Sequence, residues 1–470
     1  MTSKKTVSPV WAAIICIFLL STIFFGFVLM GLPLQTIFFV SLVFISLVAK
    51  INHFTLKEIE DMIVEGGRKS SLLVFILMAV GCVVGSWLIS GVVPSIIYYG
   101  LKILTPPTFL VMGLFICALV SIFTGSSYTS IGTMGVAFMG IGYGLGINPA
   151  LTAGMVVSGA IFGDKMSPFS DTTILASATS GINVYRHIGS MLYTTVPALL
   201  ISAILYAFFG LNHGNHTLDT SKISTINQAL SDNFHISPFL MLIPIIVVIM
   251  AIKKFPPVPS LAIGALAGVI CALVFQSDKY SLEQILKTLT NGCSITTGVA
   301  EVDTLLNRGG ILNMLSTASM AIMAMAFGEM LQQLGVLEVL TPKLKKLART
   351  PRRLVLCTLV TALLGGMITA TQILSIILTG EIFKDVYDEV GVQRRVMSRT
   401  LEDGGTIFPF LIPWAAPALY AYGILDVTSA EYGPYCFLAI LCPSIAIFYA
   451  LTGIAVFKCT PESDQIEKAQ

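Results

Sequence analysis

The chain has 470 residues, of which 55% are hydrophobic and only 11% are charged, and its mean hydropathy is +0.87. Soluble domains carry about 25% charged residues, so this composition excludes a soluble globular protein. The formal net charge of +2 gives no indication of a nucleic-acid partner. The nine cysteines form no CxxC pair and lie mostly in apolar runs, which is typical of core residues rather than of disulfides or a metal site.

Apolar runs of roughly 20 residues, the length of a membrane-spanning helix, recur along the chain. The first run is WAAIICIFLLSTIFFGFVLMG at 11–31, and the last lies at 436–457. The first is longer than the apolar core of a signal peptide, and no polar mature segment follows it, so we interpret it as an uncleaved span. The sequence therefore predicts an all-α polytopic membrane protein.

In chain order, the first half contains two spans, an amphipathic link, a third span, a surface helix, two apolar arms, an interrupted span and a closing span. The arms flank a Gly/Ser/Thr-rich stretch, FTGSSYTS at 123–130, which favours a re-entrant hairpin with a polar tip at mid-membrane. Two full crossings are also compatible with this pattern. The link is predicted at 55–66, the third span at 72–90 and the surface helix at 92–104. The interruption GDKMSPFSDTT follows at 163–173 and the closing span at 189–210.

The second half repeats this order. Prolines, glycines and threonines match at an offset of 226 and then, after an insertion near 293–311, at an offset of 245 (Pro33/Pro259, Gly66/Gly292, Thr124/Thr369, Gly159/Gly404, Pro168/Pro413). The second copy is therefore predicted to contain a link, a third span, a hairpin break, an interruption IFPFLIPWAAP and a closing span (281–292, 311–333, 368–375, 407–417 and 434–457).

Loop charge predicts that the two repeats are inverted. Lys and Arg concentrate in short cytoplasmic loops. The segment 343–353 carries six Lys or Arg residues, whereas the equivalent loop at 91–107 carries only Lys102. Each repeat then has about five spans plus one re-entrant hairpin and one broken helix, and both termini are cytoplasmic. The predicted division is a first repeat, an external linker, a second repeat and a cytoplasmic tail (11–210, 211–237, 238–457 and 458–470).

The polar stretch at 163–173 is the predicted centre of the ion site. Pro168 removes a helical N–H and disfavours helix at the preceding residue, so the span unwinds and frees carbonyl groups to hold a cation. We expect Na+ at Asp164, Asp171 and Thr172. The wider ion- or substrate-binding set adds a lysine, hydroxyl groups, the two hairpin tips and two acids of the second half (Lys165, Ser167, Thr173, Ser126, Ser127, Thr371, Gln372, Glu402 and Asp403).

Other interpretations of these residues stay open. Asp171 is also a candidate N-cap for the second half-helix. Asp164 and Lys165 are also a candidate neutralising pair, and Glu402 with Asp403 could stand near the cytoplasmic end of a span. The proton-coupling candidates are Asp164, Asp171 and Glu329, although a polar group bonded to a neighbouring helix explains Glu329 equally well.

Five segments resemble the signature segments of NhaC-type Na+/H+ antiporters, within the ion-transporter superfamily: GAIFGDKMSPFSDTT, TGSSYTSIGTMGVAFMGIG, GSWLISGVVPSIIYYGL, RHIGSMLYTTVP and RTLEDGGTIFPFLIPW. The resemblance covers nearly the whole chain. It implies a carrier of the bacterial inner membrane whose site is formed by two hairpin tips and two unwound helices. The family includes a branch similar to malate/lactate antiporters coupled to Na+ and H+. Members often carry Asn where Ile174 and Ala415 stand here, so each half lacks one amide side chain.

We therefore expect a secondary active transporter, not an enzyme, that exchanges Na+ for H+ and needs no cofactor. The chain has neither the GxxxxGK[ST] loop of a primary pump nor the HExxH motif of a membrane protease. Buried carboxylates beside a lysine suit binding and release of an ion better than free conduction through a channel. Na+/H+-coupled organic-acid exchange is the alternative. The expected partners are Na+, H+ and membrane lipid, while a small organic acid and a homodimer stay open.

The inverted arrangement predicts opposite exposure of two loops. In intact cells, a membrane-impermeant thiol reagent should label single cysteines introduced at 210–236 and should reach cysteines at 343–353 only after permeabilisation. Labelling of both segments from one side would contradict the interpretation of the loop charges.

Overall fold

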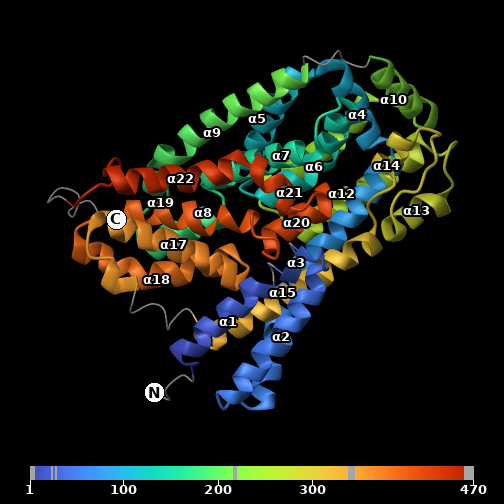
Figure 1. The fold of residues 1–470 in the computed structure, drawn as a ribbon. Coiled ribbons are helices and arrows are strands. Elements are labelled where there is room, and N and C mark those ends of the chain that lie inside the picture. The colour runs from blue at the N-terminus through green and yellow to red at the C-terminus, as the bar shows by residue number, and fades with distance from the viewer. Residues whose placement is uncertain (1–5, 23–24, 27–28, 215–219, 337–343, 460–470) are drawn as a thin grey trace.

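The computed structural model describes residues 6–22, 25–26, 29–214, 220–336 and 344–459. This part of the chain is helical apart from short connections (Figure 1). Seven of its helices are long and apolar enough to cross a membrane, or up to nine spans if each of two bent helix pairs counts as one. The prediction of an all-α polytopic membrane protein is confirmed.

The N-terminal helices are α1 (Pro9–Thr22), α2 (Leu34–Ile51), α3 (Leu56–Ile89) and α4 (Val92–Ile103). The amphipathic link and the third span, predicted as separate elements, form the single 34-residue helix α3. No proline interrupts it, and a capping box between Thr55 and Glu58 begins it. Gly66 lies within this helix, where its missing side chain lets α3 approach the backbone of Ala326.

The first hairpin and the first interrupted helix follow in the predicted order. They comprise α5 (Pro106–Thr124), α6 (Ser127–Gly144), α7 (Pro149–Met166), α8 (Asp171–Ser180) and α9 (Val184–Gly214). The interruption lies at 167–170, inside the polar stretch 163–173 where it was predicted.

The connection to the second half consists of α10 (Thr220–Asn233), η2 (Pro238–Met241) and α11 (Leu242–Ile252). The chain turns by 94° between residues 223–233 and 238–252, so the predicted first span of the second half belongs to a bent pair. The next helices are α12 (Pro257–Phe275), α13 (Leu282–Asn291), α14 (Ala300–Leu306) and α15 (Ile311–Gln333).

The second hairpin and the second interruption repeat the order of the first. The hairpin arms are α17 (Pro351–Thr369) and α18 (Gln372–Val390), and the interrupted helix is α19 (Arg394–Gly405), η3 (Phe408–Phe410) and α20 (Ala416–Leu425). The closing segment comprises α21 (Ser429–Tyr432), η4 (Gly433–Tyr435) and α22 (Phe437–Thr452). It bends by 62° at Cys436, where a single closing span was predicted.

The helices divide into two groups (Figure 1). Helix α3 packs against α12, α13 and α15 at one side of the molecule, with α2 against α15. The hairpins and broken helices form the other group, in which α7 packs on α5 and α6, and α19 packs on α17 and α18. The halves meet inside this group, because α8 contacts α18 and α20 contacts α6.

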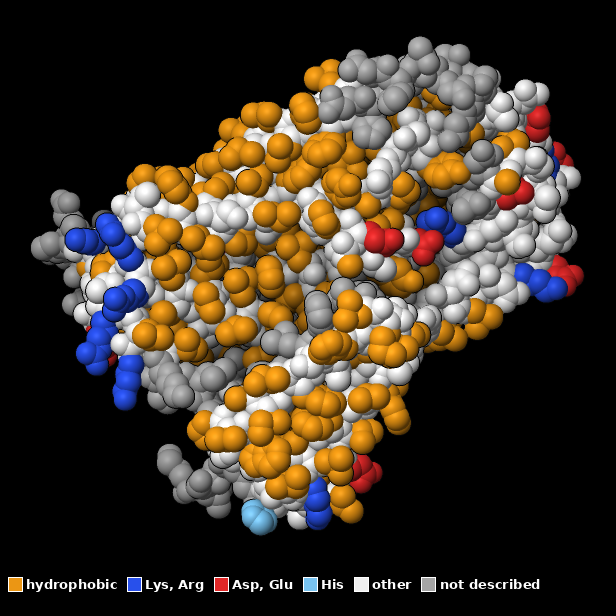
Figure 2. Space-filling view, viewed as in Figure 1, with side chains coloured by type: hydrophobic (Ala, Val, Ile, Leu, Met, Phe, Trp, Pro, Cys, Tyr) orange, Lys and Arg blue, Asp and Glu red, His pale blue; other side chains and the backbone are white. Residues whose placement is uncertain are grey.

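Hydrophobic side chains cover much of the visible outer surface, and Lys and Arg side chains gather at the end of the molecule beside the C-terminal end of α22 (Figure 2). An apolar belt between charged ends is the distribution that a lipid bilayer requires of a helical protein.

Glycines bring each broken helix close to the first arm of its own hairpin. A Cβ atom added at Gly159 of α7 would lie 2.5 Å from the carbonyl oxygen of Leu114 on α5. A Cβ atom added at Gly404 of α19 would lie 3.0 Å from the carbonyl oxygen of Leu359 on α17. The same kind of close packing therefore occurs in both halves of the chain.

Substitution of Gly159 by alanine should destabilise the protein by about 1–3 kcal/mol, because the added methyl group overpacks the contact between α5 and α7. Gly189→Ala is the matched control, since nothing lies within 4 Å of a Cβ atom there. Thermal unfolding of both purified variants measures the difference. Equal melting temperatures for the two variants would contradict this role of Gly159.

Candidate functional site

Asp164 lies at the end of α7, immediately before the first interruption, and is only 5% exposed. Two hydroxyl groups hold its carboxylate. Ser127 Oγ donates to Oδ2 at 2.6 Å, and Ser170 Oγ donates to Oδ1 at 2.6 Å. Thr172 Oγ1 lies 3.0 Å from Ser170 Oγ. The predicted residues Asp164, Ser127 and Thr172 are thus brought together, and Ser170 is a further member that sequence reasoning missed.

The tip of the first hairpin closes this interruption. Gly125 turns the chain with a φ of +66°, a conformation that favours glycine, and Ser126 caps α6 by accepting from Thr129 N. Ser167 Oγ donates to the carbonyl oxygen of Ile122 on α5 at 2.7 Å. The tip and the interruption therefore supply hydrogen-bond partners to each other.

The second half shows the same relation between tip and interruption. Ala370 adopts a φ of +56°, and Thr371 caps α18 by accepting from Leu374 N. Gln372 Nε2 donates to the carbonyl oxygen of Thr406 at 2.6 Å, directly after α19. The predicted tip residues Thr371 and Gln372 thus lie at the second interruption.

Lys165 joins the two halves of the chain. Its ammonium group lies 2.5 Å from Asp403 Oδ1, and neither side chain is exposed. Thr194 Oγ1, which sequence reasoning missed, donates to the same carboxylate oxygen at 3.1 Å. The ion pair of Lys165 is therefore with Asp403, 238 residues away, rather than with its sequence neighbour Asp164.

Glu402 is fully buried beside this pair. Neither of its carboxylate oxygens has a hydrogen-bond partner among the described residues. His187 Nε2 lies 4.0 Å from Glu402 Oε1, and His187 Nδ1 lies 2.9 Å from Ser398 Oγ.

Arg399 is a second buried cation in this region, only 1% exposed. Arg399 lies four residues before Asp403 on α19, so the two side chains share one face of the helix. Its Nη2 donates to the carbonyl oxygen of Ala455 at 3.0 Å. Its Nε and Nη1 have no hydrogen-bond partner in the described part of the chain.

Thr173 and Asp171 differ in their surroundings. Thr173 is buried and donates to the carbonyl oxygens of Asp164 and Lys165 at 3.3 and 3.2 Å, which satisfies the end of α7. Asp171 is exposed in the first turn of α8. The N-cap residue is Ser170, so the interpretation of Asp171 as the cap is wrong.

Glu329 contacts other parts of the structure. Its Oε2 lies 2.6 Å from Lys69 Nζ on α3, and its Oε1 accepts from Gln333 at 2.7 Å. These contacts join α15 to α3. Helix α15 also packs against α17, and a Cβ atom added at Gly328, beside Glu329, would lie 2.9 Å from the carbonyl oxygen of Thr369 at the end of α17.

The chemistry of the site is that of oxygen ligands and balanced charges. In the described part of the chain no group of three or more His, Cys, Asp or Glu side chains stands ready to hold a metal ion. The carboxylate, hydroxyl and carbonyl oxygens around Asp164 are instead the ligands that hard cations prefer.

Two interrupted helices, each closed by a hairpin tip beside buried charges, define the class of secondary transporters. A family model described as Na+/H+ antiporter family matches residues 2–188 and 159–454. The chain is 37% identical over 441 residues, 94% of each chain, to the malate-2H+/Na+-lactate antiporter of Bacillus subtilis (strain 168). It is 38% identical over 401 residues, 85% of this chain and 86% of the relative, to the Na+/H+ antiporter NhaC of Alkalihalophilus pseudofirmus. The chain therefore belongs to the Na+/H+ antiporter family and is a multi-pass membrane transporter rather than an enzyme.

The pair of Lys165 and Asp403 should show strong energetic coupling. Lys165→Met or Asp403→Asn alone breaks the buried ion pair, and removal of one partner from such a pair costs about 3–5 kcal/mol of stability. The double variant removes both charges, so its loss of stability should be markedly smaller than the sum of the two single losses. Thermal unfolding of the three purified variants tests the cycle, and additive losses would contradict a direct ion pair.

Proposed function

We propose that this chain exchanges Na+ for H+ across the cytoplasmic membrane by alternating access. The observation that carries the proposal is the buried Asp164 carboxylate, held by Ser127 and Ser170 at a break between two helices. Each hydroxyl group donates its proton and keeps oxygen lone pairs that can face a cation. The interruption adds carbonyl groups that no longer form helical hydrogen bonds.

In this proposal Na+ binds between Asp164, Thr172 and the first hairpin tip, formed by Ser126 and Ser127. Asp171 attracts cations at the exposed start of α8, where its charge also suits the helix dipole. The remaining predicted residues keep the two interruptions and their charges in place (Lys165, Ser167, Thr173, Thr371, Gln372, Glu402 and Asp403).

Charge balance supports coupling of Na+ to H+. Three buried carboxylates, those of Asp164, Glu402 and Asp403, accompany two buried cations, Lys165 and Arg399. With all five groups ionised the cluster carries one excess negative charge, and an uncompensated buried charge is costly. One Na+ or one H+ makes the cluster neutral, so the two ions compete. Asp164 is the proposed carboxylate of exchange, and Glu329 has no role because Lys69 already compensates it.

The recurrence of hairpin, interrupted helix and closing helix in both halves supports two inverted repeats. In this arrangement both hairpins are re-entrant, their tips meet the interruptions near mid-membrane, and both termini are cytoplasmic. Lys165 and Asp403 then connect the repeats at the site, where a change of access has to act.

Organic-acid exchange coupled to Na+ and H+ is the second candidate function. The relative named a malate-2H+/Na+-lactate antiporter covers 94% of the chain at 37% identity, and the relative named NhaC covers 85% at 38%. The unpartnered N–H groups of Arg399 also favour it, because a guanidinium group suits carboxylate recognition. In proteoliposomes, Na+ movement driven by a pH gradient without organic acid supports simple exchange, and an absolute requirement for malate or lactate supports the second function.

Asp164→Asn should abolish this Na+ movement, because the amide cannot exchange a proton and leaves the cluster neutral without Na+. Asp171→Asn should retain exchange but with a weaker apparent affinity for Na+, because the exposed Asp171 carboxylate only attracts cations to the site. Glu60→Gln, an exposed change on α3, is the matched control for insertion and expression. Wild-type exchange by Asp164→Asn would contradict the proposal, because the coupling carboxylate would then lie elsewhere.

A further inference from the structure

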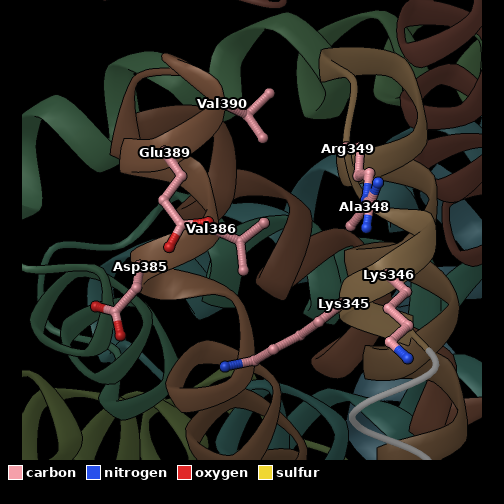
Figure 3. A pocket seen from close by; sticks show the side chains of 8 residues that line it. All are labelled: Lys345, Lys346, Ala348, Arg349, Asp385, Val386, Glu389 and Val390. Carbon is pink, nitrogen blue, oxygen red and sulfur yellow. The ribbon is translucent and has the colours of Figure 1, made fainter.

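A charged groove with a volume of about 470 Å³ lies between residues 345–349 and the last two turns of α18. Lys345, Lys346 and Arg349 come from one wall, Asp385 and Glu389 come from the opposite wall, and the side chain of Lys345 extends across the groove towards the acidic wall (Figure 3). Asp385 and Glu389 are four residues apart on the helix, so their carboxylates share one face.

The walls are not joined by ion pairs. None of these five charged side chains forms a salt bridge in the part of the chain that the structure describes, although Asp388 on the same helix pairs with Arg394 at 2.6 Å. Separated positive and negative walls attract an occupant that carries both signs of charge. A simple anion would match the basic wall only and would face two carboxylates across the groove.

The groove lies at an end of the membrane-spanning helices. Its basic wall directly precedes Pro351, the first residue of the candidate span α17, and its acidic wall belongs to the last turns of α18. Leu347, between the basic residues, is 56% exposed, and Val386 and Val390 line the groove. Charged and apolar groups therefore meet here, as they do at the headgroup layer of a bilayer, and basic pockets between such helices bind lipid headgroups.

We propose that this groove binds the headgroup of phosphatidylethanolamine from the adjacent leaflet. The lipid phosphate accepts charge-assisted hydrogen bonds from Lys346 and Arg349, and the lipid ammonium, two carbons away, donates to Asp385 and Glu389. The headgroup thereby neutralises both walls at once. It also holds the C-terminal end of α18. Gln372, at the N-terminal end of the same helix, donates the hydrogen bond to Thr406 at the second interruption.

Native mass spectrometry of the full chain released from mixed-lipid nanodiscs measures the bound lipid directly. The wild type should retain phosphatidylethanolamine at least about tenfold better than phosphatidylglycerol, which lacks the ammonium. The wild type should prefer phosphatidylethanolamine over phosphatidylcholine by the same factor, because the methylated nitrogen of phosphatidylcholine cannot donate a hydrogen bond. D385N/E389Q should lose this preference and keep phosphatidylglycerol binding, whereas K346Q/R349Q should lose both lipids.

K57Q/D61N removes an exposed ion pair on α3 and is the matched control, which should behave like the wild type. Equal retention of the three lipids by the wild type would overturn the proposal without involving any variant. An unchanged preference in D385N/E389Q would overturn it as well. The readout is lipid binding alone, so it does not depend on which ions the protein exchanges.

Discussion

The structure depends on one constraint: a helix interrupted within a membrane must find all its hydrogen-bond partners inside the protein. At the first interruption, Thr173 satisfies carbonyl groups at the end of α7, and Ser167 bonds to α5. At the second, Gln372 bonds to Thr406. Each interruption therefore requires a hairpin tip of its own half, and the tip residues become neighbours of the buried charges.

The same constraint explains why the charges are shared between halves. A lysine at the end of α7 needs a buried counter-charge, and Asp403 at the end of α19 supplies it. The contacts of α8 with α18 and of α20 with α6 hold these two helix ends together. The Lys165–Asp403 pair is therefore a direct link between the two halves of the chain beside the candidate site.

The local sequence was sufficient to predict the helix interruptions and hairpin tips, but not the side-chain pairs between distant segments. Pro168 and the prolines of IFPFLIPWAAP predicted both interruptions, because proline disrupts a helix wherever it stands in the interior. The Gly/Ser/Thr stretches predicted both tips for a similar reason. The continuity of α3 was missed, since a charged amphipathic stretch followed by an apolar one resembles two elements. Asp403 as the partner of Lys165, and the burial of Arg399, depend on contacts between distant segments that local patterns do not record.

The central claim is that the buried cluster carries one excess negative charge that either Na+ or H+ neutralises. The most direct test measures Na+ binding to the purified full chain by calorimetry at several values between about pH 6 and pH 9. Because binding of Na+ displaces one proton, apparent Na+ affinity should fall about tenfold for each unit of decreasing pH once protons compete, with release of one proton per Na+. Na+ affinity that is independent of pH, with no proton release, would contradict the account.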